Sequence, residues 1–120
     1  MPLNKVVLIG RLTRDPEVRY TPSGKVFCSF TLAVDRPFSN QQGEHVADFI
    51  PVVLWSKQAE IAGNSCTKGN RVAVEGRLQI RTYDDKDGQK HWVTEVVGDR
   101  IEFVENKKTS FPLGEEVPFD

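Results

Sequence analysis

The chain has 120 residues, enough for one domain with a substantial core and too few for two. Hydrophobic residues make up 38% and charged residues 28%. Apolar runs such as Val6–Ile9 are far shorter than the ~20 residues of a membrane-spanning helix. With no charged leader segment visible, we expect a cytoplasmic protein, or the mature form of an organellar one, without a membrane partner.

The formal net charge of −1 is unevenly distributed along the chain. Residues 1–104 carry 14 Lys and Arg against 13 Asp and Glu, a balance of +1, whereas residues 105–120 carry 2 against 4, a balance of −2. The acidic excess therefore lies at the end of the sequence. The net charge by itself does not indicate a nucleic-acid-binding protein, because such proteins are usually basic.

The first half of the chain predicts two strands before a long loop. Residues 3–12 are rich in β-branched residues, and Gly10 marks a bulge or a close approach of two backbones. A turn at 21–24 follows a possible short strand near 18–20. Residues 25–36 then alternate strictly, so that one face is predicted to enter the core. That face carries Val26, Cys28, Phe30, Leu32 and Val34.

The segment Asp48–Lys57 follows the loop at 37–45 and predicts a third strand that is apolar on both faces. Ile50, Val52 and Leu54 share one face, while Phe49, Pro51, Val53 and Trp55 share the other. A strand of this kind is either buried on both sides or presents rings to a partner. Phe49 and Trp55 lie about 20 Å apart on an extended strand, a spacing that suits an elongated ligand.

The second half predicts a short helix and two long strands. Residues 56–66 favour a helix, with Ser56 as its N-cap and Gly63-Asn64 near its end. Residues 71–83 alternate again, with Val72, Val74, Gly76, Leu78 and Ile80 predicted to point inward. A hairpin loop at 84–90 leads to the last strand, 91–104, where Gly98 indicates a bulge.

This order predicts an all-β fold, a five-stranded Greek-key barrel of the oligonucleotide-binding kind, with one short helix between its third and fourth strands. A β-sandwich is the alternative, but sandwiches usually need about seven strands. The barrel would occupy residues 1–104. Residues 105–120 have two prolines and no periodicity, and we expect a short disordered acidic tail.

The sequence offers no catalytic or metal-binding motif. It has two histidines, His45 and His91, and no nucleophile elbow or glycine-rich phosphate loop. The segment 85–88 resembles a calcium loop only superficially, because the required ligand positions are wrong. Cys28 and Cys66 are widely separated, and we expect two buried reduced thiols. We therefore predict a protein that is not an enzyme and has no metal or cofactor.

Aromatic and basic residues at predicted outward positions favour a binding function. Rings can stack on nucleic-acid bases, and cations can follow the phosphate backbone. The alternative for each ring is a place in the core or in a subunit contact, and isolated arginines often serve only solubility. The candidate DNA-binding residues are Arg11, Phe27, Arg36, Phe38, Phe49, Trp55, Lys57, Arg77, Arg81 and Tyr83, with Trp92 as a weaker candidate.

An ordered set of motifs over residues 4–104 resembles the bacterial single-stranded DNA-binding protein family. The motifs are Asn4-Lys5-Val6, Ile9-Gly10-Arg11-Leu12, Asp15-Pro16-Glu17-Val18-Arg19-Tyr20, Gly24, Leu32-Ala33-Val34, Val52-Val53-Leu54-Trp55-Ser56-Lys57-Gln58-Ala59-Glu60, Lys68-Gly69, Val74-Glu75-Gly76-Arg77-Leu78 and Thr94-Glu95-Val96-Val97. The resemblance implies an oligonucleotide-binding fold, a homotetramer, and binding of single strands without strict sequence choice during replication, recombination and repair, with no cofactor.

The resemblance also implies roles for individual residues. The base-stacking aromatic positions of the family fall on Phe38, Phe49, Trp55 and Tyr83, and many members have Trp where this chain has Phe38, Phe49 and Tyr83. The family's acidic tail ends in Pro-Phe and is bound by replication and repair proteins. Here the corresponding docking tip is Glu115, Glu116, Val117, Pro118 and Phe119. Asp120 follows Phe119, which differs from the family's terminal Phe, and the linker is short.

Two other classes of protein have features in common with this sequence. A replication-restart adaptor of similar barrel fold would act mainly through protein–protein contacts, and it would lack an acidic apolar tip such as residues 115–119. A structural barrel with no nucleic-acid function would show no salt-dependent binding to oligonucleotides.

Overall fold

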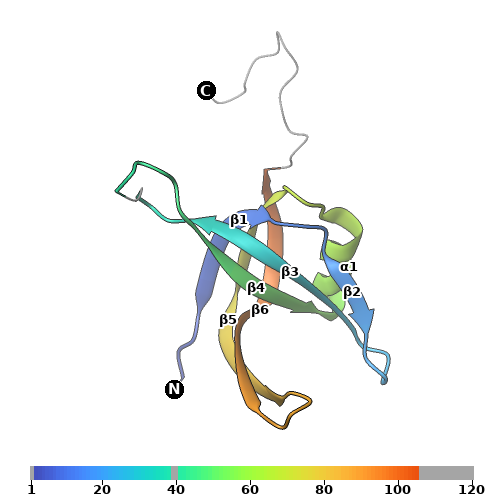
Figure 1. The fold of residues 1–120 in the computed structure, drawn as a ribbon. Helices are drawn as coiled ribbons and strands as arrows, with labels where there is room; N and C mark the ends of the chain where they lie inside the picture. Colours follow the sequence, from blue (N-terminus) through green and yellow to red (C-terminus); the bar gives the residue numbers. More distant parts are fainter. Residues whose placement is uncertain (1, 39–40, 106–120) are drawn as a thin grey trace.

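The computed structural model describes residues 2–38 and 41–105. Within them, six strands and one helix follow one another along the chain (Figure 1). These elements are β1 (Val6–Leu12), β2 (Glu17–Tyr20), β3 (Val26–Asp35), β4 (Ala47–Trp55), α1 (Ser56–Ser65), β5 (Arg71–Asp84) and β6 (Lys90–Glu105). The predicted all-β architecture with one short helix is confirmed. The predicted tail at 105–120 lies, apart from Glu105, outside the described residues.

The five long strands form a closed ring in the order β1-β5-β6-β4-β3, because β1 also pairs with β3. Neighbouring strands are antiparallel except β4 and β6, which run parallel over Val52–Leu54. The short strand β2 pairs with β3 outside the ring, at the position where the sequence indicates a stub. This closure removes most free strand edges, in agreement with the predicted oligonucleotide-binding barrel.

The alternating pattern determines which side chains fill the barrel. Cys28, Leu32, Val52 and Leu54 are fully buried, and the outward partners between them are partly or fully exposed. Burial raises the pKa of the Cys28 and Cys66 thiols to about 11, and both cysteines are free. The predictions of a core face on β3 and of two buried thiols are confirmed. Of the two apolar faces of β4, one is buried in the core, whereas Phe49 and Trp55 on the other face are exposed.

Two glycines permit the close contacts on which closure depends. A Cβ atom on Gly10 would lie 2.4 Å from the carbonyl oxygen of Ala33, so β1 can cross β3 only if this residue has no side chain. At Gly76, a Cβ atom would lie 2.1 Å from the carbonyl oxygen of Val97. The register between β5 and β6 shifts between Glu75 and Gly76, which leaves Asp99 as an extra residue beside Gly98. The predicted close approach and bulge are therefore found.

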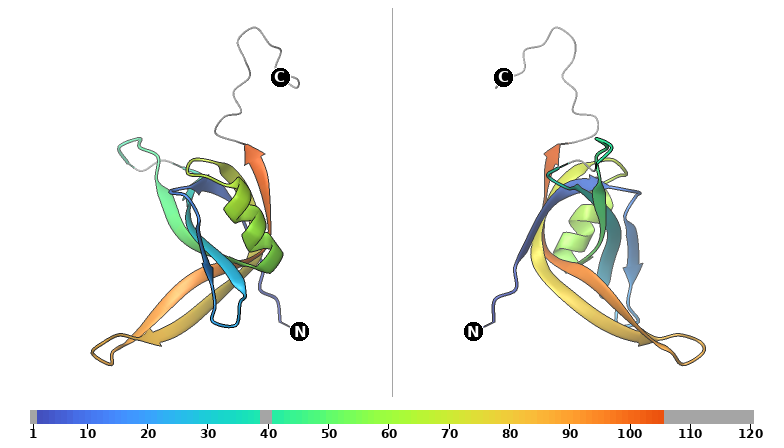
Figure 2. Two further views of the ribbon diagram at one scale, coloured as in Figure 1. Left: turned by 90° about the vertical axis from the view of Figure 1, so that its right-hand side faces the viewer. Right: turned by 60° about the vertical axis from the view of Figure 1, so that its left-hand side comes forward.

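The far halves of β5 and β6 leave the barrel as a projecting two-stranded hairpin (Figures 1 and 2). β1 pairs with β5 only as far as Gly76, and β4 pairs with β6 only over Val96–Gly98. Beyond these points, no other strand in the described part of the chain pairs with the two-stranded hairpin. Leu78 and Ile80 are therefore exposed, and the prediction that they point into the core is wrong.

Helix α1 packs against β3, β4 and β6 at one end of the barrel (Figure 2). It buries Ala59 and Ala62. Ser56 is not the N-cap, because the cap position is Trp55 and no side chain caps the helix; Ser56 itself has a φ of 55°. The described part of the chain contains no helix long and apolar enough to cross a membrane.

Candidate nucleic-acid interface

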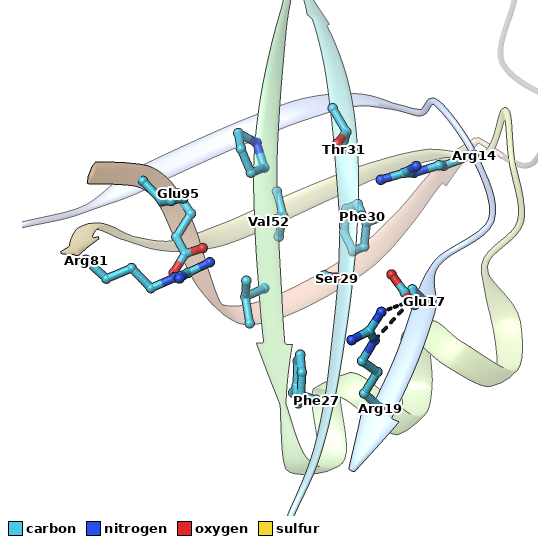
Figure 3. Close-up of a pocket in the computed structure, with 13 residues that line it drawn as sticks. Arg14, Glu17, Arg19, Phe27, Ser29, Phe30, Thr31, Val52, Arg81 and Glu95 are labelled. Atoms are coloured by element: carbon cyan, nitrogen blue, oxygen red, sulfur yellow. Dashed lines mark hydrogen bonds and ion pairs between the residues drawn. The ribbon is translucent and has the colours of Figure 1, made fainter. Parts of the chain in front are cut away.

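A groove crosses the outer faces of β3 and β4 (Figure 3). It consists of two hollows of about 290 and 330 Å³ that share the lining residues Phe27, Val53, Arg81 and Glu95. The projecting hairpin forms one wall and β2 forms the other, so the floor lies between two elements that both carry arginine. An open groove that consists of two joined hollows fits an extended chain better than a compact small molecule.

Trp55 and Phe27 form the aromatic part of the floor. They are cross-strand partners on β4 and β3, with ring centroids 5.1 Å apart and planes tilted by 34°. Trp55 is 40% exposed, whereas Phe27 is only partly exposed beneath it. Phe27 thus supports one side of the indole while the rest of the indole remains open to a ligand.

The hairpin wall carries a half-exposed arginine held by a buried carboxylate. Arg81 Nε donates to Glu95 Oε2 at 3.1 Å, and Gln79 Nε2 donates to the same oxygen at 3.0 Å. The Glu95 side chain is 5% exposed and that of Arg81 is 52% exposed. The bond from Nε holds the Arg81 guanidinium group at the groove, while about half of the side-chain surface stays accessible to an anion.

Arg14 and Arg19 line the opposite wall, and neither was among the candidates from sequence. Arg19 donates to Glu17 Oε2 through Nε and Nη2, at 2.9 and 2.6 Å. In the register of the sheet, Arg19 pairs with Phe27, which in turn pairs with Trp55. The pattern of β2 alone places Arg19 on one face, but only the pairing of β2 with β3 shows that this face continues the groove.

A second row that also joins an arginine to an exposed ring crosses the sheet near the other end of β4. Arg11 pairs with Ala33, and Ala33 pairs with Phe49, whose side chain is 66% exposed. Arg11 Nη1 donates to the carbonyl oxygen of Gly69 at 2.9 Å, and Arg11 lines a separate hollow of about 320 Å³ together with Ala33. We call Arg19-Phe27-Trp55 and Arg11-Ala33-Phe49 the two arginine–aromatic rows.

Arg36 and Phe38 lie at the start of the loop that joins β3 to β4. Arg36 makes a bidentate contact with Asp48, with Nη2 to Oδ1 at 2.8 Å and Nε to both oxygens at 3.2 Å. This hydrogen bond lowers the pKa of Asp48 and raises that of Arg36. Phe38 is 70% exposed. Arg36 therefore already has an acidic partner, whereas the Phe38 ring is open to solvent.

The remaining candidates lie outside the groove. Lys57 is exposed in the first turn of α1, and Arg77 Nη1 donates to Gln79 Oε1 at 3.4 Å. Tyr83 is 47% exposed near the end of the hairpin and stacks on His91. Parity places Tyr83 on the same face of β5 as Arg81, so a ligand leaving the groove along the hairpin would meet it. Among the described residues, no cluster of three or more His, Cys, Asp or Glu could hold a metal ion.

Curated relatives resemble this chain over most of its length. Proteins named single-stranded DNA-binding protein are 53% identical over 115 residues in Halalkalibacterium halodurans and 55% identical over 105 residues in Caldanaerobacter subterraneus. A single-stranded DNA-binding protein 2 from Listeria innocua is 54% identical over 103 residues. These matches cover 96%, 88% and 86% of this chain and 68%, 70% and 65% of the respective relatives, so the chain spans about two thirds of their length.

The family comparison agrees with these relatives. A family model described as the single-strand binding protein family matches residues 3–104, which include all six strands except Glu105, the last residue of β6. The two arginine–aromatic rows, the groove and the projecting hairpin all lie inside this range. The chain therefore belongs to the single-strand binding protein family, a family of binding proteins and not of enzymes.

Proposed function

We propose that this protein binds single-stranded DNA without strict sequence preference. The observation that carries the proposal is the pair of arginine–aromatic rows, each of which places an arginine and an exposed ring across the same outer surface. Every base has a π-face, so stacking tolerates any sequence, and arginine binds the phosphates that all nucleotides share. The names of the relatives point to the same ligand.

The strand would run along β4 and out over the hairpin. Trp55 and Phe49 would stack on bases at two points, and Tyr83 and Phe38 would extend the contact at either end. Arg11, Arg19 and Arg81 would bind the intervening phosphates, with Arg36, Lys57 and Arg77 contributing charge near the path. A duplex cannot use the rings in this way, because its bases are already stacked and paired.

A matched pair of arginines tests this proposal. Arg19 on β2 pairs with Glu17, and Arg100 on β6 pairs with Glu102; in both pairs the side chains are 63% and 53% exposed. Of these two arginines, Arg19 lines the groove and Arg100 does not. Arg19→Ala should weaken binding to oligo(dT) and reduce the slope of log affinity against log salt by about 0.7, the value expected for one lost phosphate contact. Arg100→Ala should leave both unchanged.

This binding path is contradicted if the two variants show the same affinity and the same salt dependence. If Arg19→Ala and Arg100→Ala lower the affinity and the slope to the same extent, the charge acts nonspecifically and the groove is not the binding site. Light scattering on each variant confirms that neither substitution has altered assembly. Fluorescence anisotropy of a labelled oligo(dT) gives the affinity without reference to the intrinsic tryptophans.

We propose that the protein acts as a homotetramer. Large apolar side chains outside the groove support self-association, among them Val7, Ile9, Ile80 and Trp92, all strongly exposed. Solvent-exposed apolar side chains in such number favour burial in a subunit contact. Light scattering should give a mass four times that of the 13.6 kDa chain. A monomer at all concentrations would contradict this assembly.

In the cell, we propose that the protein protects single strands during DNA replication, recombination and repair, in the cytoplasm and associated with the nucleoid. Its acidic tip, Glu115–Phe119, would recruit replication and repair proteins; it lies outside the described residues. An aromatic residue beside acidic ones is suited to docking in a basic pocket with an apolar floor. Phe119→Ala should abolish binding to these partners and leave the affinity for oligo(dT) unchanged.

A further inference from the structure

Three residues at the end of the projecting hairpin form a connected cluster. Tyr83 on β5 and His91 on β6 are cross-strand partners, and their rings stack with centroids 5.2 Å apart and planes inclined by 18°. His91 Nε2 lies 2.7 Å from Asp85 Oδ2. The tyrosine is therefore in contact with a second ring, which is itself in contact with the hairpin turn.

Asp85 is fixed by the backbone of that turn. Its Oδ1 accepts the backbone N–H groups of Asp87 and Gln89 at 2.9 and 2.8 Å, and its own backbone N–H and C=O bond to Gln89 and Gly88. The hydrogen bond from His91, followed by that from Gln89, lowers the pKa of Asp85. A carboxylate can only accept, so His91 Nε2 is the donor. Both carboxylate oxygens are engaged, and the imidazole is held in one orientation.

We propose that His91 is a positioning residue for single-stranded DNA: it covers one face of Tyr83 and leaves the opposite face of that ring to receive a base. This inference rests on the proposed function. The supporting geometry is the nearly parallel stack, together with the exposure of Tyr83, which at 47% is too open for both of its faces to be covered by the protein. A base arriving at Tyr83 would complete a stack of three rings.

The need for such support follows from the position of Tyr83 in the fold. Among the described residues, no other strand pairs with the hairpin beyond Gly76 and Val96, so the barrel does not restrain side chains at the hairpin tip. An isolated tyrosine there would lose rotamer freedom when a base binds, and this loss weakens affinity. By packing on His91, the ring is held before the ligand arrives. Trp55 receives the corresponding support from Phe27 at the other end of the site.

Three substitutions of His91 separate stacking from hydrogen bonding. His91→Ala removes both, His91→Phe keeps a flat ring, and His91→Gln keeps a donor toward Asp85 without a ring. Binding of the full chain to labelled oligo(dT) is measured by anisotropy. We expect His91→Ala and His91→Gln to weaken binding about three- to tenfold, the range of one aromatic pair, and His91→Phe to restore it to within about twofold of the unmodified chain.

Two further variants complete the experiment. Thr82→Ala removes an exposed β-branched side chain from the other face of the same hairpin, and it should change affinity by less than about twofold if loosening of the hairpin is not the cause. Tyr83→Ala should weaken binding at least as much as His91→Ala. Light scattering confirms that each variant keeps the assembly of the unmodified chain.

Several results would overturn the inference. If His91→Gln restores binding and His91→Phe does not, the bond to Asp85 acts instead of the stack. If Thr82→Ala has the same effect as His91→Ala, the cause is general hairpin stability. If Tyr83→Ala weakens binding but His91→Ala does not, the positioning role is wrong while the proposed function stands. If the unmodified chain does not bind oligo(dT), the proposed function itself is wrong.

Discussion

Replacement of Trp55 by alanine removes the largest ring of the candidate site and should reduce affinity for single strands without unfolding the chain. Stacking on an aromatic ring contributes about 1–3 kcal/mol per base, which corresponds to a loss of about 5- to 150-fold in affinity. Trp55 is 40% exposed and rests on Phe27. The cost in folding free energy should therefore be smaller than for a buried aromatic, about 1–2 kcal/mol.

The assay is anisotropy of labelled oligo(dT) at constant salt, with guanidinium unfolding as the measure of stability. Trp55→Phe is the matched control because it keeps a ring on Phe27, and it should lose no more than about threefold in affinity. The double variant with Phe27→Ala should show a coupling of about 0.5–1.5 kcal/mol, since the two rings are in contact. A folded Trp55→Ala variant that binds as tightly as the unmodified chain would refute the assignment of Trp55 to the site.

Three further predictions concern the fold. Gly10→Ala places a Cβ atom 2.4 Å from a backbone carbonyl of β3, so it should lower stability by about 2 kcal/mol or more in guanidinium unfolding; an unchanged midpoint would show that the barrel adapts at this crossing. Arg36 lowers the pKa of Asp48 in the folded chain. The pair therefore stabilises the fold at pH values above the unfolded-state pKa of the carboxyl group, about 3.9. This stabilisation is lost as the pH falls through the lower pKa that Asp48 has in the folded state. Unfolding midpoints measured between about pH 5 and pH 2 should therefore fall less steeply in Asp48→Asn than in the unmodified chain, and identical profiles would exclude the pair as a cause. Cys28 and Cys66, whose thiol pKa values are about 11, should not react with a thiol reagent at neutral pH until guanidinium unfolds the chain; rapid labelling of the native protein would mean that the core opens readily.

Parity separated the two faces of β3 and β4, and it succeeded because one face of each strand is covered along most of its length. Once Val52 and Leu54 point inward, Phe49 and Trp55 must point outward, whatever the register. The aromatic half of the candidate site could therefore be identified before the fold was known. Gly10 and Gly98 likewise mark a crossing and a bulge, since a strand interior tolerates glycine mainly for such reasons.

Features that depend on pairing between distant segments could not be predicted in this way. The inward pattern of β5 continues through Leu78 and Ile80, yet the barrel wall ends at Gly76, and periodicity contains no information on where a neighbouring strand stops. Arg19 was not selected for the same reason: its place beside Phe27 follows from the register of β2 on β3, which no local pattern specifies. The partners of Arg36 and Arg81 also come from other strands or from across the loop.

The central claim, that rings and cations bind single-stranded DNA together, is tested most directly by titrating the unmodified chain with oligo(dT) and with a duplex of equal length at two salt concentrations. Tryptophan fluorescence reports the result, because Trp55 lies in the groove and Trp92 on the other face of the hairpin. We predict strong quenching by the single strand, weak or no response to the duplex, and lower affinity at higher salt. Equal binding of both DNA forms, or binding that is insensitive to salt, would contradict the account.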